Sequence, residues 1–379
     1  MSERPYLDYY ISNKIIPVRQ DISQLESHLK RRSVLYHHLS IPPAAVRSQR
    51  VLEIGPGTGD NAIHTASLSP KAYVLVDGNP YSIAATKERL ADSRFSFSEI
   101  PEIELVECDF FHYHDERRFD LVLCEGIIPG QTEGARFLQH AASFVDIGGL
   151  LVITTMSATS VLAEVSRRLL KPVISMRAIG QEDLFGQLQA IFTTHLETLS
   201  GRSRVAEDWI RDNILQPWPK SVVFTMNDAI GDRFDVYGTS PQLIQDFRWY
   251  KTAAVDGVTM NNVARKQWEK WSAIFIDYRA DTDKPPGIDS KELEIECLGI
   301  LMDAHEAWRI EDLSKVESCV GRIARLGEWI CPYLPTTAAS IRDFVAGAAA
   351  LIDGAAFEFP EFKSWFGRGQ QYVSFLRIH

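Results

Sequence analysis

The residues with the clearest chemical potential are three glycines that alternate in a short run. The run reads VLEIGPGTGDN over residues 51–61, and Gly55, Gly57 and Gly59 follow Glu53 in it. Glycine lets the backbone turn sharply and lets a ligand approach without a Cβ in the way. The flanking pattern predicts a buried strand before the turn and a helix behind it, whose free amides and positive end would face that ligand. The run therefore indicates a site for a nucleoside-bearing ligand.

The spacing of the glycines limits which nucleoside ligand fits. A dinucleotide-binding turn has the pattern G-x-G-x-x-G, and its third glycine would fall at position 60, where this chain has Asp60. The chain also has no G-K-[ST] sequence in this turn, as a phosphate-binding P-loop would require. The turn therefore favours a cofactor without phosphates.

Polar side chains also close the next predicted strands. The segment AYVLVD ends on Asp77, IELVECDFF places Asp109 and Phe110 at the end of a third strand, and FDLVLCEGIIPG places Glu125 at the end of a fourth. A carboxylate in the position of Asp77 can accept hydrogen bonds from both ribose hydroxyls. Because ligands of open parallel sheets bind at the carboxyl ends of the strands, we expect these groups to meet at one edge. GGLLVITT, residues 148–155, predicts a fifth strand.

With these motifs in this order, residues 51–155 resemble the core of a class I S-adenosylmethionine-dependent methyltransferase. The resemblance implies an α/β fold with a doubly wound, mostly parallel, seven-stranded Rossmann-like sheet, and S-adenosylmethionine as the cofactor. It implies that the glycine turn surrounds the methionine part, that Asp77 holds the ribose and that Asp109 takes the adenine amino group. Phe110 would lie beside the adenine ring, and the turn that starts at Glu125 would lie below the sulfonium. The full set of cofactor-binding residues expected on this basis is Glu53, Gly55, Gly57, Gly59, Asn61, Asp77, Gly78, Asp109, Phe110, Glu125 and Tyr10.

Several of these assignments have structural alternatives. Asp77 could cap the helix that follows it, Asp109 could belong to a simple turn, and Glu125 could be a solvated loop residue. The tyrosines near the N-terminus, Tyr10 among them, could cover the methyl donor or pack against the core.

Composition narrows the class of protein. The chain has 379 residues, 45% of them hydrophobic, and a formal net charge of −10, which argues against a nucleic-acid substrate because phosphate binding needs a basic surface. The short basic run at residues 30–32 is typical of a solvated helix face. No apolar stretch is long enough for a membrane span, and the five scattered cysteines predict reduced thiols in a cytoplasmic protein. No Cys or His spacing supports a metal site.

The hydrophobic pattern divides the chain into three regions. Residues 1–45 predict a helical segment, and the resemblance to methyltransferases implies that this segment lies over the cofactor as a lid. Residues 46–255 predict the methyltransferase domain, with a helical insertion around residues 157–220 and the last two strands, paired antiparallel, at VVFTMND and FDVYGTSP. Residues 256–379 have a helical pattern throughout, and we expect this C-terminal region to be all-helical. It would form a wall of the substrate pocket or the surface of a homodimer.

The expected reaction follows from the chemistry of the donor. Methyl transfer requires alignment of the acceptor with the methyl carbon and removal of a proton from a neutral acceptor, and Glu125 is the base we expect. The D/N-P-P-Y motif of enzymes that methylate planar nitrogens is absent, since C-E-G-I-I-P stands in its place. We therefore expect metal-independent methyl transfer to an oxygen or amine of a small molecule or glycan building block. A protein or peptide methyltransferase and a non-catalytic cofactor-binding partner subunit remain alternatives.

Overall fold

The computed structural model describes residues 4–16, 19–20, 22–92, 94–95, 102–199, 205–216 and 228–379. The chain forms two compact units. Unit 1 combines Met1–Thr155, Ser221–Trp268 and Gln370–His379, and unit 2 combines Met156–Lys220 and Glu269–Gly369. Each unit is therefore assembled from segments that lie far apart in the sequence.

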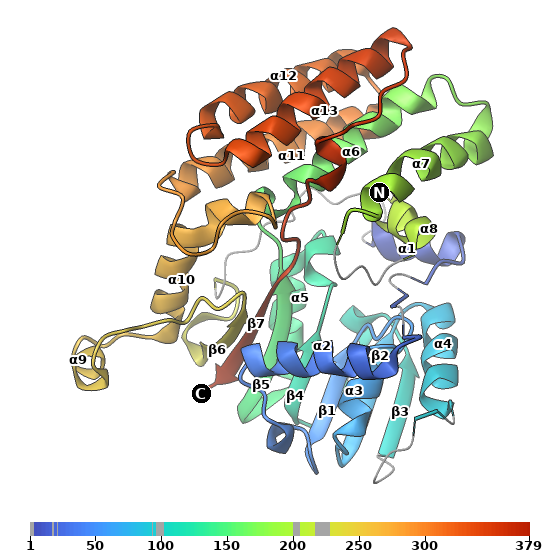
Figure 1. Ribbon diagram of the computed structural model, residues 1–379. Helices are drawn as coiled ribbons and strands as arrows, with labels where there is room; N and C mark the ends of the chain where they lie inside the picture. The colour runs from blue at the N-terminus through green and yellow to red at the C-terminus, as the bar shows by residue number, and fades with distance from the viewer. Residues whose placement is uncertain are drawn as a thin grey trace. The chain divides into compact units, whose positions relative to one another are not determined.

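A seven-stranded sheet forms the centre of the described part of unit 1, in the order β3-β2-β1-β4-β5-β7-β6 (Figure 1). Strands β1 to β5 are parallel, and β7 runs antiparallel to both of its neighbours. This confirms the expected doubly wound, mostly parallel fold. The strands are β1 (Arg50–Ile54), β2 (Ala72–Asp77), β3 (Glu102–Glu107), β4 (Phe119–Cys124), β5 (Val145–Thr155), β6 (Phe234–Ser240) and β7 (Gln371–Arg377).

The origin of the last strand differs from the sequence prediction. An antiparallel pair does close the edge of the sheet, but β7 comes from the end of the chain, where Val373 pairs with Ile153 on one side and Thr239 on the other. The C-terminal helical region is present, yet the expectation that it is all-helical is wrong at its end. Residues 222–227 of the predicted VVFTMND strand lie outside the described residues. Strand pairing over such a sequence separation leaves no local signal, which is why β7 was missed.

Apolar strands and amphipathic helices build the core of unit 1. The residues of β1 and β2 are almost all buried, as expected of parallel strands that are covered on both faces. Helix α2 lies across one face of the sheet (Figure 1), and its Tyr36 packs in one hydrophobic cluster with Val51, Tyr73 and Leu121. The helices of this unit are α1 (Pro5–Ser12), α2 (Leu25–His38), α3 (Ala62–Ser67), α4 (Pro80–Ala91), α5 (Gly134–Ser143), α9 (Tyr250–Val255) and α10 (Met260–Trp271), which continues into unit 2.

Unit 2 is helical in its described residues and joins the insertion after β5 to the C-terminal helices. Its helix α6 is buried along most of its length. Glu294 accepts hydrogen bonds from the backbone amides of Ala158 (2.6 Å) and Thr159 (3.0 Å) at the start of α6, which satisfies two amides that a helix leaves unpaired. The main helices are α6 (Ala158–Ser175), α7 (Gly180–Leu196), α8 (Ala206–Ile210), α11 (Ser290–Ile310), α12 (Leu313–Ile330) and α13 (Pro335–Asp353).

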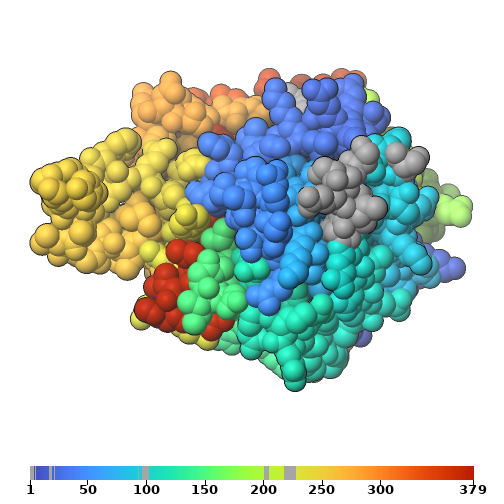
Figure 2. All heavy atoms as spheres, turned by 90° about the horizontal axis from the view of Figure 1, so that it is seen from below, coloured from blue at the N-terminus to red at the C-terminus, as the bar shows by residue number. Residues whose placement is uncertain are grey.

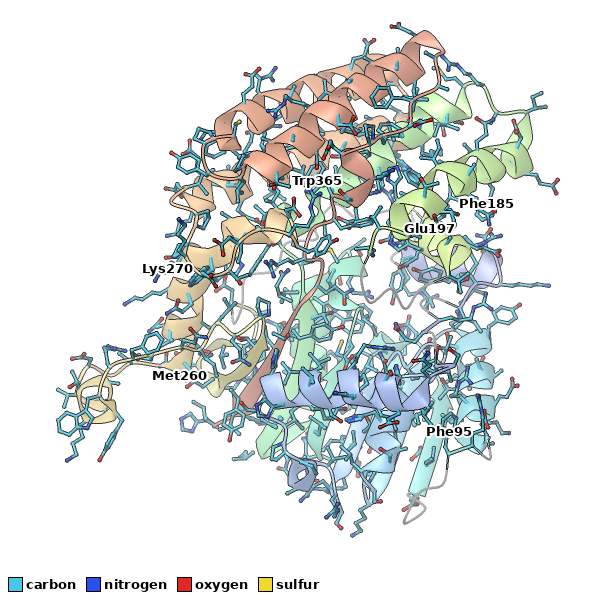
Figure 3. The ribbon with its side chains drawn as sticks, viewed as in Figure 1. Phe95, Phe185, Glu197, Met260, Lys270 and Trp365 are labelled. Atoms are coloured by element: carbon cyan, nitrogen blue, oxygen red, sulfur yellow. The ribbon has the colours of Figure 1, made fainter. Side chains whose placement is uncertain are left out.

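A buried arginine and a buried tryptophan connect segments of unit 2 that lie far apart in the sequence. The Arg167 guanidinium lies 3.8 Å from the centroid of the Phe366 ring, and its Nε donates to Nδ1 of His195 at 3.2 Å. Trp365, labelled in Figure 3, is fully buried and donates its indole N–H to the carbonyl of Ile276 at 2.7 Å. Such buried donors are stable because each has a partner. Across the described residues of both units, no helix is long and apolar enough to span a membrane.

Candidate cofactor site at the carboxyl edge of the sheet

The glycine turn follows β1 and adopts the conformation that its sequence demands. Gly55, Gly57 and Gly59 have φ values of 67°, 60° and 76°, a region that favours glycine. A Cβ on Gly59 would lie only 2.9 Å from the Cα of Thr86 in α4, and a Cβ on Gly55 would overlap the side chain of Ile127. Larger residues are therefore excluded from the turn for two reasons: their backbone would be strained at these positive φ values, and their Cβ atoms would lie too close to Thr86 or Ile127.

Asp77 ends β2 and faces the glycine turn. Its carboxylate accepts hydrogen bonds from the backbone amides of Asn79 (2.8 Å) and Gly57 (3.4 Å). The N-cap of α4 is Asn79, whose side chain accepts from the amide of Tyr81 at 3.1 Å, so Asp77 is not the residue that caps this helix. Burial raises the pKa of Asp77 to about 6, while the two amides oppose that rise. A carboxylate held in this way is ordered and has acceptor capacity to spare.

Asp109 and Phe110 follow β3. Asp109 caps the short helix η2 (Phe110–His112) by accepting from the amide of Phe111 at 3.1 Å. It also forms an ion pair with Arg4, which precedes α1. The Phe110 ring is buried and packs against Phe137 at a centroid distance of 5.0 Å. The predicted turn is therefore real, and it presents the Asp109 carboxylate at the same edge as Asp77.

A single pocket brings these positions together. It has an empty volume of about 410 Å³, including the part open to solvent. Helix α1 and the residue before it cover part of it. The lining residues are Arg4, Tyr6, Leu7, Ile54, Gly55, Val76, Asp77, Gly78, Asp109, Phe110, Phe111, Ile127, Gln131 and Phe137.

Glu125, after β4, is neither a solvated loop residue nor a free carboxylate. Arg32 of α2 donates to both of its oxygens, Nη1 to Oε2 at 2.8 Å and Nη2 to Oε1 at 2.6 Å. Arg32 is only 6% exposed. Burial opposes its charge, but Glu125 outweighs burial and holds the Arg32 pKa well above its usual value. Such a bidentate pair is among the strongest polar contacts in proteins.

Arg32 is the residue that sequence reasoning missed. The basic run at residues 30–32 was expected to be a solvated helix face, and for Arg32 this expectation is wrong. His28 and Tyr36 lie four positions before and after Arg32, and both are buried. Residues four apart share a face of a helix. The apolar and aromatic neighbours on this face are the signal that could have indicated an inward-facing arginine.

Glu53 lies beside this pair at the end of β1. It is 8% exposed and accepts a hydrogen bond from the hydroxyl of Tyr73. Burial raises the pKa of Glu53 to about 7, the Tyr73 hydroxyl lowers it, and the nearby charge of Glu125 raises it further. The buried Glu53 and Arg32 and the partly buried Glu125 thus form one charged group next to the glycine turn.

The remaining predicted positions differ in their relation to the pocket. Gly78 lines it, and a Cβ there would lie 2.9 Å from Cδ2 of Leu7. Asn61 precedes α3 without a capping hydrogen bond from its side chain. Tyr10 is 4% exposed and packs edge-on against Tyr6 at a centroid distance of 5.6 Å. Of these two tyrosines, Tyr6 lines the pocket and Tyr10 supports it.

The geometry agrees with comparisons to known proteins. Residues 46–190 match a family model described as "Methyltransferase domain". A curated relative, malonyl-[acyl-carrier protein] O-methyltransferase 1 of Ilyobacter polytropus, is 23% identical over 134 residues, which are 35% of this chain and 46% of that enzyme. The matched region thus spans about half the length of that relative.

Solved structures of methyltransferases are also similar to part of the chain. N-methyltransferase NodS from Bradyrhizobium japonicum is 23% identical with a TM-score of 0.31, and the match covers 40% of this chain and 73% of NodS. Magnesium protoporphyrin IX methyltransferase from Synechocystis is 14% identical with a TM-score of 0.32, over 41% and 76% of the two chains. On the family match and the fold, residues 46–190 are a methyltransferase domain of class I, the class that uses S-adenosylmethionine.

Proposed function

We propose that the chain transfers the methyl group of S-adenosylmethionine to an oxygen or amine of a small molecule or glycan building block, without a metal. The observation that carries this proposal is the pocket at the carboxyl edge of the sheet, which brings Gly55, Asp77 and Asp109 together. Ligands of open α/β sheets bind at this edge. The bound cofactor would supply a methyl group activated by its sulfonium.

The residues around the pocket fit the adenosine part of this cofactor. A carboxylate has about four acceptor sites, and Asp77 uses two of them for backbone amides, so the ribose hydroxyls can donate to the others. Asp109 can accept from the adenine amino group once its contact with Arg4 opens. Phe110 and Ile127 supply apolar surface for the base.

The charged group beside the glycine turn fits the methionine part. That part carries one carboxylate and one ammonium, and the pair of Arg32 and Glu125 offers one cation and one anion. Nε of Arg32 is buried and finds no hydrogen-bond partner among the described residues. An unpaired buried donor is costly, and a carboxylate ligand would satisfy it. We assign Arg32 to the cofactor site on this basis.

The state of Glu125 narrows the class of acceptor. Both oxygens of Glu125 already accept hydrogen bonds from Arg32, so Glu125 would have to leave this strong pair to take a proton from an acceptor. The proton of a neutral alcohol is therefore hard to remove by Glu125. Acceptors that are nucleophilic without a strong base, such as a carboxylate oxygen or an unprotonated amine, fit best. The curated relative is by its name an O-methyltransferase of malonyl-[acyl-carrier protein], which agrees with an oxygen acceptor of this kind.

Two measurements on the purified chain test the proposal. Isothermal titration calorimetry should show binding of S-adenosylmethionine, and release of S-adenosylhomocysteine should rise with at least one member of a panel of carboxylic acids, amines and sugar nucleotides. Absence of cofactor binding would refute the proposal as a whole. Tight binding without turnover on the panel, or turnover only with peptides, would support the non-catalytic subunit or the peptide methyltransferase instead.

A further inference from the structure

Unit 1 carries an exposed aromatic surface that the cofactor site does not use. We call residues 246–257 the α9 tip. Its large apolar side chains are Phe247, Trp249, Tyr250 and Val255, with exposed fractions of 92%, 63%, 71% and 86%. In Figure 1 the tip stands apart from the sheet, beyond β6, and in Figure 2 the yellow atoms of this part of the chain project at the left of the view.

The tip is ordered by polar contacts rather than by a core of its own. Arg248 pairs with Asp246 at 2.5 Å and with Asp256 at 3.3 Å, so one guanidinium joins the two ends of the tip. Behind it, the N-terminal end of α10 is fixed to β6, because the amide of Asn261 donates to Asp235 at 3.0 Å. Met260, labelled in Figure 3, marks this anchor point. The aromatic side chains are therefore displayed on a fixed support.

Among the described residues of its own chain, the helix of the tip has no apolar support, although its ends are held by polar contacts. Helix α9 has six residues and no buried residue, whereas isolated helices shorter than about 12–15 residues are marginal in water. The three aromatic side chains leave roughly 450 Å² exposed, if a fully exposed ring contributes about 200 Å². The largest apolar patch on a typical monomer is about 300–600 Å² and is often functional.

We propose that the α9 tip is a self-association surface that binds the α9 tip of a second copy of this chain. The distribution of charge favours contact between two copies of the chain at the α9 tip rather than elsewhere on the surface. The chain has a net charge of −10, so two copies repel each other generally. The tip itself is neutral, because Arg248 and Lys251 balance Asp246 and Asp256. Two tips can therefore approach without the repulsion that the rest of the surface would impose.

The tip is also chemically self-complementary, as a twofold contact requires. Lys251 lies 4.9 Å from the centroid of the Trp249 ring in its own chain, which shows that cation and ring are presented together. Across a twofold axis, each aromatic face would meet the partner's rings and lysine. If all of this exposed aromatic surface were covered, two tips would bury roughly 900 Å² in total, which is about a quarter less than the lower limit of the 1,200–2,000 Å² of stable interfaces. We therefore expect a weak, concentration-dependent dimer rather than a permanent one.

Light scattering coupled to size exclusion, over a wide range of protein concentration, tests this proposal. The mass of the wild-type chain should rise from 42.8 kDa towards twice that value, and the double variant F247S/W249S should stay monomeric at every concentration. The matched control is Ile179→Ser, because Ile179 is 91% exposed but lies in unit 2, and it should associate like the wild type.

Three outcomes would overturn the proposal. They are a wild-type chain that remains monomeric throughout, a double variant that still dimerises, or a monomeric chain that floats with vesicles of phosphatidylcholine and phosphatidylglycerol. The last result would identify the tip as a membrane-binding surface. If thermal unfolding shows that the double variant does not fold, Tyr250→Arg serves instead, since it would place like charges opposite each other across the twofold axis.

Discussion

Replacing Asp77 by asparagine tests the assignment of the ribose site most directly. The substitution keeps the shape of the side chain but removes its charge and one acceptor oxygen. The shorter hydrogen bond, from the amide of Asn79 at 2.8 Å, can persist, whereas the longer one from Gly57 at 3.4 Å is expendable. Because burial already disfavours the charge of Asp77, a neutral residue should cost the fold little. The change should therefore act on binding and leave stability nearly intact.

The magnitude follows from the hydrogen bonds that the carboxylate would offer. Bonds to a charged group contribute about 1.5–3 kcal/mol and neutral ones about 0.5–1.5 kcal/mol. For two ribose hydroxyls the difference amounts to roughly 2–3 kcal/mol, which is a loss of affinity of roughly 30- to 150-fold. Calorimetry with S-adenosylmethionine measures this loss directly.

A second aspartate provides the control. Asp120 lies near the start of β4, at the opposite end of the sheet, and accepts from the amide of Arg50 at 2.8 Å. Asp120→Asn should bind the cofactor like the wild type. If Asp77→Asn melts within a few degrees of the wild type and also binds equally well, the ribose assignment is wrong.

The remaining predictions concern pH, the buried ion pair and the glycine turn. Because the pKa of Asp77 is raised to about 6, its charged fraction falls as pH falls through that value. Cofactor affinity should then drop about tenfold between pH 7 and pH 5. If the ratio of the wild-type affinity to the Asp77→Asn affinity is the same at both pH values, this prediction is wrong. Arg32→Met leaves the partly buried Glu125 unpaired, so urea denaturation should show a loss of about 3 kcal/mol, at the lower end of the cost of breaking a buried pair, largely recovered in Arg32→Met/Glu125→Gln. Equal stability of the single and double variants would count against the pair. Gly148→Ala, at φ 79° in open space, should cost about 1 kcal/mol of backbone strain, and Gly59→Ala should cost more because its Cβ meets α4; equal costs would show that α4 adjusts freely.

The elements that the sequence predicts correctly are those whose residue patterns lie within one short stretch of the chain. The strand, glycine turn and helix around Gly55 depend on neighbouring residues, and so do the apolar strands that end at Asp77, Asp109 and Glu125. A parallel α/β arrangement then brings the ends of these strands to one edge without further information. This is why the sheet was predicted, and why five of the fourteen residues that line the pocket are among the predicted site residues, namely Gly55, Asp77, Gly78, Asp109 and Phe110.

What the sequence left undecided depends on contacts between distant segments. Strand β7 pairs with β5 more than two hundred residues earlier in the chain, and no local pattern marks QYVSFLR as its partner. Arg32 and Glu125 are 93 positions apart, and the two side chains pair only when α2 lies on the sheet. The sequence shows that residue 125 is a glutamate, but it does not show that Arg32 forms an ion pair with it. Local chemistry thus determined the sheet edge and the cofactor class, whereas tertiary packing decided which carboxylates are free to act, because burial and pairing are properties of the folded chain.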